Sequence, residues 1–193
     1  MKSQMNKQQM LQVLSEKVAT CNKCSELACY RTQTVFGEGN PDAKVVFIGE
    51  APGEKEDESG RPFVGPAGKL LTNILLAFGF KREDVYIMNI LRCRPPRNRV
   101  PTEEEANNCR PFLDLQLKII SPKYIVCMGN AAAQNLLRVN TPISSLRGED
   151  LWYNGTKVIC TYHPSYLLRN PSQKDKVAAD LQWLLEMMKG DNE

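Results

Sequence analysis

Residues 44–57, with the sequence KVVFIGEAPGEKED, decide the fold. Residues 44–48 form a short apolar run with two valines and an isoleucine, which predicts a buried strand. A loop rich in glycine, proline and carboxylates follows directly and continues to about residue 66. A buried strand that ends in such a loop is typical of α/β proteins, which bind ligands beyond the carboxyl ends of their strands.

The same alternation of strand and helix continues to the end of the chain. A capping box of Thr102 and Glu105 marks the start of one helix, and Gly79 follows the end of another. Short apolar strands alternating with helices predict an α/β fold with a mostly parallel sheet covered on both faces. The further predicted strands are 85–89, 124–128 and 157–162, and the predicted helices are 6–19, 67–78, 102–120, 130–137 and 173–189.

Length and composition indicate one globular domain spanning residues 1–193. The chain is 42% hydrophobic and 24% charged, which excludes a disordered or collagen-like protein. No apolar run approaches the roughly 18 residues of a membrane span, and residues 1–20 lack the apolar core of a secretory signal. We therefore expect a cytoplasmic protein, and a monomer because no oligomerisation motif is visible. The net charge of +3 is too small to indicate nucleic-acid binding by itself.

The seven cysteines indicate a metal site. An odd number in a chain without an export signal favours metal ligation or buried thiols over disulfides. Cys21 and Cys24 form a C-x2-C pair, and Cys93 and Cys109 form a second pair. Four thiolates suit either zinc or an iron–sulfur cluster, and the spacing leaves that choice open. The remaining cysteines are Cys127 and Cys160, which we assign to the core, and Cys29, which we leave open.

The loop after the first strand contains two candidate ligand-binding residues. Glu50 directly follows the strand, and Phe63 lies in the segment GRPFVG at 60–65. Phe63 is either a platform for stacking on a planar ring or an anchor packed on the core. The segment GPAGKL at 65–70 is similar to a phosphate-binding loop. We exclude that function because Phe63 replaces the first required glycine and Leu70 replaces the required hydroxyl residue.

Two later loops carry the other candidates. Asn89 ends the second strand, where an amide either pairs with a base edge or caps a turn. The segment RCRPPRNR at 92–99 contains four arginines and no acid, so it is either a solvated basic loop or a phosphate-binding one. His163, the only histidine, follows the last strand and precedes a proline suited to the first turn of a helix. Its place predicts that Glu50, Asn89 and His163 face one crevice.

Taken together, these motifs resemble family 4 uracil-DNA glycosylases, the bacterial and archaeal iron–sulfur branch of the uracil-DNA glycosylase superfamily. The resemblance rests on the order GEAPGxxED, GRPFVG, a strand ending in asparagine, CRPPxNR and HPSYLLR, and on all four paired cysteines. It covers the chain from about residue 21 to the final helix. It implies a three-layer α/β/α sandwich with a four-stranded parallel sheet. It also implies a [4Fe–4S] cluster held by Cys21, Cys24, Cys93 and Cys109.

The resemblance further implies a role for each residue of the crevice. Phe63 stacks on uracil, Asn89 reads the uracil edge, and His163 donates a hydrogen bond to uracil O2. Glu56 lies near uracil C5, where the methyl group of thymine collides. Backbone and side-chain groups of Glu50 and Ala51 line the pocket. Family 1 enzymes are similar in this loop but carry an aspartate where Ala51 stands, so Glu50 is the candidate for the carboxylate that activates water.

The implied activity is that of a monofunctional uracil-DNA glycosylase of base excision repair. It flips deoxyuridine out of DNA and hydrolyses its N-glycosidic bond, which leaves an abasic site. DNA is the expected partner, single- or double-stranded. No histidine occurs between Arg92 and Arg110 to trap the sugar, so we predict free turnover. The predicted phosphate ligands are Arg94, Arg97, Arg99 and Arg169.

Three other interpretations stay open from the sequence. Helix-hairpin-helix glycosylases also carry iron–sulfur clusters, but their cysteines lie together near the C-terminus. A non-catalytic, metal-stabilised DNA-binding module needs the arginine loop and the cysteines but not Phe63, Asn89 or His163. A ferredoxin-like electron carrier needs only the cysteines and has no affinity for nucleic acid.

Overall fold

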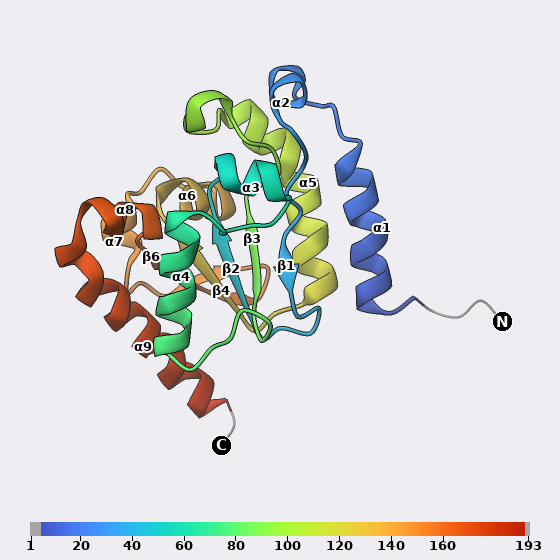
Figure 1. Ribbon diagram of the computed structural model, residues 1–193. Coiled ribbons are helices and arrows are strands. Elements are labelled where there is room, and N and C mark those ends of the chain that lie inside the picture. Colours follow the sequence, from blue (N-terminus) through green and yellow to red (C-terminus); the bar gives the residue numbers. More distant parts are fainter. Residues whose placement is uncertain (1–4, 192–193) are drawn as a thin grey trace.

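The computed structural model describes residues 5–191 and places six strands in one sheet, in the order β1-β3-β2-β4-β6-β5 (Figure 1). The expected number of four strands in the sheet is therefore wrong. The four central strands are parallel, and one short antiparallel strand flanks them at each edge. The central strands are β3 (Tyr86–Asn89), β2 (Val45–Gly49), β4 (Tyr124–Met128) and β6 (Thr156–Thr161), and the edge strands are β1 (Glu38–Gly39) and β5 (Leu151–Tyr153).

Helices cover both faces of this sheet, as the sequence predicts. Strand β2 shows why, because Val46 and Ile48 belong to the core on one face, and Val45 and Phe47 to the core on the other. The first core contains side chains of α1 (Lys7–Ala19), α5 (Glu103–Ile120), α6 (Asn130–Leu137) and α7 (Ile143–Leu146). The second contains side chains of α4 (Pro66–Ala77), α8 (Pro164–Arg169) and α9 (Lys174–Gly190).

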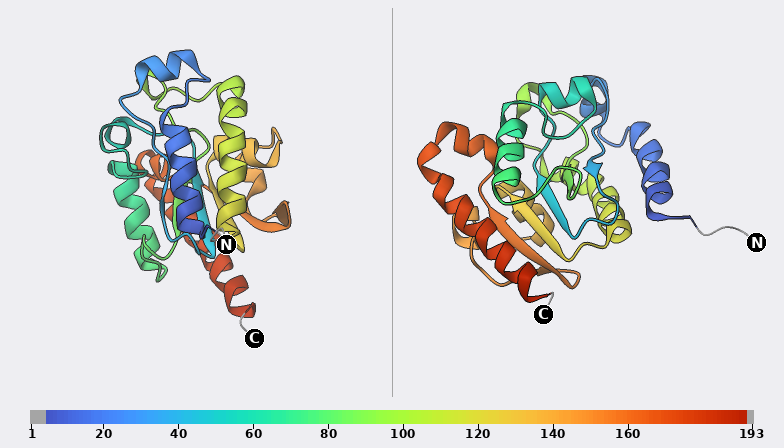
Figure 2. Two further views of the ribbon diagram at one scale, coloured as in Figure 1. Left: turned by 90° about the vertical axis from the view of Figure 1, so that its right-hand side faces the viewer. Right: turned by 60° about the horizontal axis from the view of Figure 1, so that its bottom comes forward.

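The remaining helices are short and lie beyond the sheet. They are α2 (Ser25–Tyr30), α3 (Glu54–Ser59) and the 3-10 turns η1 (Pro96–Asn98) and η2 (Pro171–Gln173). Figure 1 shows α2 and α3 above the strands, and Figure 2 shows α1 lying alongside α5, which it contacts. The described residues contain no helix that is both long enough and apolar enough to cross a membrane.

The capping box predicted at the start of α5 is confirmed. The Thr102 hydroxyl accepts the Glu105 backbone N–H at 3.2 Å, and the Glu105 carboxylate accepts the Thr102 N–H at 2.9 Å. Two of the otherwise unpaired amides at this helix start are thereby satisfied. This fixes where α5 begins and therefore where the arginine-rich loop before it ends.

The parallel register brings the predicted site residues together at the carboxyl ends of the central strands. Gly49 at the end of β2 pairs with Asn89 at the end of β3, and Met128 of β4 pairs with Thr161 of β6. Because these strands run in the same direction, the loops that follow all four start at the same end of the sheet. The candidate site is therefore built from segments more than 100 residues apart in the chain, such as Glu50 and His163.

Candidate active site

A cavity of about 860 Å³ lies at the carboxyl ends of the central strands. Its volume is in the range of small-molecule sites in proteins. A second hollow of about 800 Å³ lies between α1 and β1, but none of the predicted site residues lines it. The first cavity is lined by every predicted residue of the crevice, namely Glu50, Ala51, Glu56, Phe63, Asn89 and His163.

Asn89 presents an unused hydrogen-bond acceptor to this cavity. The residue is only 2% exposed, and its Oδ1 atom has no hydrogen-bond partner within residues 5–191. An unpaired buried acceptor is costly, so such an atom indicates a place for a ligand donor. Gly49 permits the arrangement, because a Cβ atom there would lie 2.6 Å from Asn89 Oδ1 and 2.4 Å from Phe63 Cζ.

Phe63 lies beside Asn89 and His163, as predicted. Its side chain is buried, with 6% of its surface exposed, and packs with the core between β2 and α4. It is nevertheless part of the cavity wall, and its ring centroid lies 5.5 Å from that of His163 with the planes tilted by 34°. Phe63 therefore combines both interpretations, since it is anchored in the core and has an aromatic surface on the cavity.

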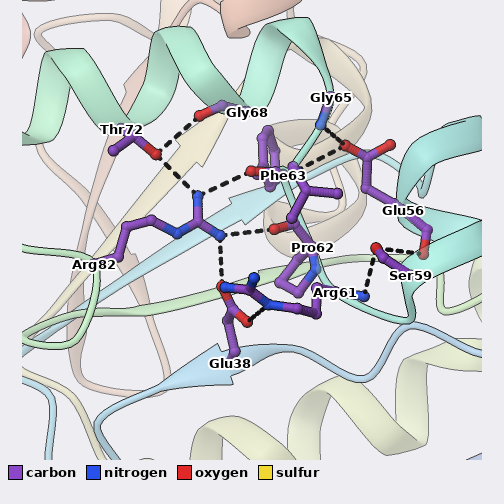
Figure 3. A network of polar contacts seen from close by, with 11 residues as sticks. Glu38, Glu56, Ser59, Arg61, Pro62, Phe63, Gly65, Gly68, Thr72 and Arg82 are labelled. Atoms are coloured by element: carbon purple, nitrogen blue, oxygen red, sulfur yellow. Dashed lines mark hydrogen bonds and ion pairs between the residues drawn. The ribbon is translucent and has the colours of Figure 1, made fainter.

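Glu56 holds the loop that carries Phe63. Its Oε1 atom accepts the backbone N–H groups of Val64 at 2.9 Å and Gly65 at 2.8 Å (Figure 3). Its Oε2 atom accepts the N–H of Gly53 at 3.2 Å, at the start of α3. A carboxylate is stabilised by such N–H donors at a helix start. The position of Glu56 near a pyrimidine C5 stays a prediction.

The imidazole of His163 is oriented by the helix that it caps. Its Nδ1 atom accepts the backbone N–H of Ser165 at 3.0 Å and lies 2.7 Å from the Ser165 hydroxyl. A neutral ring that accepts at Nδ1 carries its proton on Nε2, which makes Nε2 a donor. Burial, with the nearby charge of Arg169, lowers the pKa of His163 from 6.5 to about 4. The imidazole is therefore neutral at physiological pH.

Glu50 is the carboxylate without a partner in the cavity. In the described part of the chain, no hydrogen bond or ion pair to its side chain is present, and burial raises its pKa above the usual value. Ala51 next to it contacts both the cavity and the cluster of Leu27, Leu91, Cys93 and Cys109. A half-buried carboxyl with a raised pKa is a candidate proton acceptor.

The four paired cysteines line one small hollow behind Ala51. Arg31 Nη1 donates to Cys93 Sγ at 3.2 Å, and Asn108 Nδ2 donates to Cys24 Sγ at 3.6 Å. Burial raises the pKa of the Cys93 thiol to about 11, so a thiolate there needs a metal to stabilise it. Among residues 5–191, no three side chains are arranged around a single metal ion. Four thiol side chains lining one hollow, two of them with hydrogen-bond donors directed at sulfur, are the kind of ligand set that an iron–sulfur cluster takes.

The other cysteines lie elsewhere. Cys127 and Cys160 are fully buried, pair in register between β4 and β6, and belong to the core, as assigned. Cys29 is exposed on α2 and does not line the hollow.

The arginines of the basic loop point in different directions. Arg94 and Arg97 make no ion pair in the described chain, and the same is true of Arg169 on the cavity wall. Arg99 also lines the cavity, but it forms ion pairs with Glu105 at 2.7 Å and Glu26 at 3.0 Å. Its charge is therefore compensated within the protein. Of the remaining predicted phosphate ligands, Arg169 carries uncompensated positive charge on the cavity wall, whereas Arg94 and Arg97 lie on the basic loop and do not line the cavity.

Arg92 has a role that the sequence does not indicate. The sequence predicts that the arginines of the basic loop face either solvent or phosphate, but Arg92 is 1% exposed. Its guanidinium donates to the backbone carbonyl of Asn89 and, at 2.6 Å, to Gln116 Oε1. Since Arg92 directly precedes Cys93, it connects the cysteine cluster to the backbone of Asn89. Only its position next to an apolar pair, Ile90 and Leu91, distinguishes it in the sequence.

Comparison with known proteins agrees with this geometry. The profile of the Uracil DNA glycosylase superfamily matches residues 36–185. The Type-4 uracil-DNA glycosylase of Thermotoga maritima is 48% identical over 170 residues, covering 87% of this chain and 88% of that protein. The one from Archaeoglobus fulgidus is 45% identical over 179 residues, covering 89% of both chains. The resemblance predicted from the motifs is confirmed, and the chain belongs to the uracil-DNA glycosylase superfamily.

Proposed function

We propose that this protein hydrolyses the N-glycosidic bond of deoxyuridine in DNA, releasing uracil and leaving an abasic site. The observation that carries the proposal is the convergence of three groups on one cavity: the ring of Phe63, the unpaired Oδ1 of Asn89 and the Nε2 donor of His163. A flat heterocycle with an N–H donor and carbonyl acceptors matches all three. The names of the similar proteins agree with that assignment.

The amide of Asn89 explains selection of uracil over cytosine. Uracil has an N–H at position 3 and a carbonyl at position 4, which complement the Oδ1 acceptor and the Nδ2 donor of the amide. Cytosine has an unprotonated N3 and an amino group at position 4, so both contacts become mismatched. Mismatched buried polar groups discriminate strongly between substrates. Thymine has the same polar edge as uracil, and we assign its exclusion to contact between its methyl group and Glu56.

His163 supplies the electrostatic stabilisation of the reaction. Breaking the N-glycosidic bond leaves negative charge on uracil and positive charge on the sugar. In the proposed complex, the Nε2–H of His163 donates to O2 of the departing base. One preorganised donor of this kind typically contributes a factor of about 10²–10³ in kcat. A neutral imidazole is sufficient, because it presents the same N–H without the cost of burying a charge.

Water attack completes the reaction, and Glu50 is the carboxylate that we assign to it. Ala51 stands where family 1 enzymes carry an aspartate, and alanine has no group that accepts a proton. If the bond to the base is largely broken in the transition state, the sugar is already a strong electrophile. A weakly held water beside Glu50 then suffices, and this is consistent with the small side chain at position 51.

A [4Fe–4S] cluster fits Cys21, Cys24, Cys93 and Cys109, and when bound it supplies a cross-link between residues near α2 and the basic loop. Arg169 places positive charge on the cavity wall, and Arg94 and Arg97 add positive charge on the basic loop next to it. Flipping a base out of the stack costs a few kcal/mol, and phosphate contacts offset that cost. DNA bound in this way presents the extruded nucleotide to the cavity.

The decisive experiment compares oligonucleotides that differ at one base. The purified protein is incubated with labelled strands containing uracil or thymine, and abasic sites are cleaved with alkali. We expect cleavage of the uracil strand alone. Asn89→Ala should keep DNA affinity and lose uracil release, which separates the enzyme from a DNA-binding module. Absence of cleavage by the wild-type holoprotein contradicts the proposal, and a protein–DNA adduct in a denaturing gel contradicts free turnover.

A further inference from the structure

We propose that Arg82 is a positioning residue for base binding: together with Glu56 it fixes the peptide group between Phe63 and Val64, and thereby the Phe63 ring. This inference rests on the proposed function. Arg82 lies outside the cavity, in the turn between α4 and β3, and none of its atoms lines the site. Its effect on the base is therefore indirect.

The guanidinium of Arg82 binds two successive backbone carbonyls. Nη1 donates to the carbonyl of Phe63 at 2.9 Å, and Nη2 donates to the carbonyl of Pro62 at 2.7 Å (Figure 3). Nη1 also lies 3.3 Å from the hydroxyl of Thr72 in α4. A planar guanidinium is suited to such forked binding, whereas a lysine ammonium is a single point charge. Arg82 therefore fixes the orientation of the chain at 62–63.

Glu56 binds the same peptide group from its other end. The peptide between Phe63 and Val64 has its carbonyl on Arg82 and its N–H on Glu56 Oε1, at 2.9 Å in both cases. A positive group on the oxygen and a negative group on the N–H both stabilise the dipole of that peptide. Figure 3 shows the two side chains approaching the loop from opposite sides. We call this arrangement of Arg82 and Glu56 the peptide clamp.

The backbone of Phe63 explains why a clamp is needed. Its φ of +52° is in the left-handed region, which residues with a Cβ atom rarely adopt. Such a conformation persists only where the surroundings impose it. Gly68 allows α4 to approach closely, because a Cβ there would lie 1.9 Å from the carbonyl carbon of Phe63. Without the clamp, the loop is free to relax to an ordinary φ, which turns the ring away from the cavity.

Glu38 of β1 holds Arg82 in place. Arg61, the second arginine bound to Glu38, provides a matched control. Its carboxylate accepts Arg82 Nη2 at 2.6 Å and also Arg61 Nε at 2.8 Å. Burial of Glu38 opposes ionisation, but the two guanidinium groups outweigh it and hold its pKa below the usual value. The side chain of Arg82 is 18% exposed, whereas that of Arg61 is 61% exposed. Arg61 thus shares the carboxylate of Arg82 but bonds neither loop carbonyl.

The first test needs no substrate. Amide hydrogen exchange at Val64 and Gly65 is measured for the wild-type holoprotein, Arg82→Gln and Arg61→Gln. We expect exchange at these two amides to accelerate at least about tenfold in Arg82→Gln, in line with loss of a charged hydrogen bond. Arg61→Gln should leave it unchanged. Equal exchange in all three proteins overturns the proposal, whether or not the protein releases uracil.

The second test measures the effect on the base. With a single-stranded uracil oligonucleotide, we expect Arg82→Gln to raise KM about tenfold and to change kcat less, whereas Arg61→Gln keeps both constants. In a Phe63→Leu background, the same Arg82→Gln change should have no further effect, because the ring it positions is gone. Equal losses in both backgrounds overturn the proposal, since Arg82 then acts independently of Phe63.

A third variant covers the case in which Arg82→Gln does not fold. Arg82→Lys keeps the charge beside Glu38 but cannot bridge the carbonyls of Pro62 and Phe63. Thermal unfolding and iron content establish that it is folded. We expect faster exchange at Val64 and Gly65 in this variant also, and full protection there overturns the clamp.

Discussion

His163 Nδ1 accepts the backbone N–H of Ser165 at 3.0 Å, and this one bond determines that the ring donates from Nε2. Because burial lowers its pKa to about 4, we expect the ring to stay neutral through the physiological range. The chain has a single histidine, so its ring resonances need no assignment by mutagenesis. An NMR titration should give a midpoint near 4 and a proton on Nε2. A midpoint near 6.5 contradicts the lowering of the pKa by burial, and a proton on Nδ1 instead of Nε2 contradicts the assigned donor.

The same pKa shift makes a prediction about stability. As pH falls below 6.5, the unfolded chain binds a proton at His163 before the folded protein does. The free energy of unfolding therefore decreases between pH 6.5 and 4, by at most about 1.4 kcal/mol per pH unit from this residue. Urea unfolding of wild type and His163→Gln at several pH values isolates the effect. The free energy of unfolding should fall more for the wild type than for the variant as the pH is lowered. Equal decreases in the two proteins contradict a contribution from His163.

Gly49 tests the packing of the base site. A Cβ atom at this position would lie 2.4 Å from Phe63 Cζ and 2.6 Å from Asn89 Oδ1, so Gly49→Ala must displace one or both. Overpacking of this kind costs about 1–3 kcal/mol, and we expect kcat/KM to fall about 10- to 100-fold. Gly190→Ala is the matched control, since no atom of residues 5–191 lies within 4 Å of a Cβ placed there. Wild-type kinetics in Gly49→Ala contradict the placement of Phe63 and Asn89.

The arginines differ in ways that salt titration detects. Each contact with a DNA phosphate steepens the salt dependence of affinity by about one unit on a log–log plot. Arg94→Gln, Arg97→Gln and Arg169→Gln should each reduce that slope, because these side chains have no acidic partner in the described chain. Arg99→Gln should reduce it less, because Glu105 and Glu26 already compensate its charge. An equal reduction in all four variants contradicts this distinction.

The sequence predicts the centre of this fold better than its edges. The buried strands are visible because each is a run of apolar and β-branched residues, and their parallel order follows from the helices between them. Strand β1 has two residues and β5 has three, too few for any periodic pattern. Helix α3 looks like a loop because it consists almost entirely of charged residues, although acids in its first turn stabilise it. Tertiary contacts determine these short elements.

The site shows the same division between residue type and direction. Phe63, Asn89 and His163 are predictable because each stands beside a strand end or a turn signal. The inward direction of Arg92 and the ion pair between Arg99 and Glu26 depend on residues far away in the chain. Arg82 is a single arginine in a polar turn, and its bonds to the carbonyls of Pro62 and Phe63 leave no local pattern. A sequence shows which residues are charged, but it does not show which residues they pair with.

The cysteines give the last prediction. Cys21, Cys24, Cys93 and Cys109 line one hollow, so replacing any of them with alanine should lower iron content and iron–sulfur absorbance. Cys29→Ser is the matched control, because Cys29 is exposed and outside the hollow, and it should keep a full complement of iron.

Loss of iron should also destabilise the protein, because the proposed cluster would cross-link segments about 70 residues apart, at Cys24 and Cys93. Closing a loop of that length by a covalent bridge stabilises a fold by roughly 4 kcal/mol in the chain-entropy description. Thermal unfolding of Cys93→Ala and Cys29→Ser should therefore differ by several degrees or more. If Cys29→Ser loses iron as completely as Cys93→Ala, the ligand set contains Cys29 and the assignment from the hollow is wrong. If all variants keep iron, the four sulfurs are not its ligands.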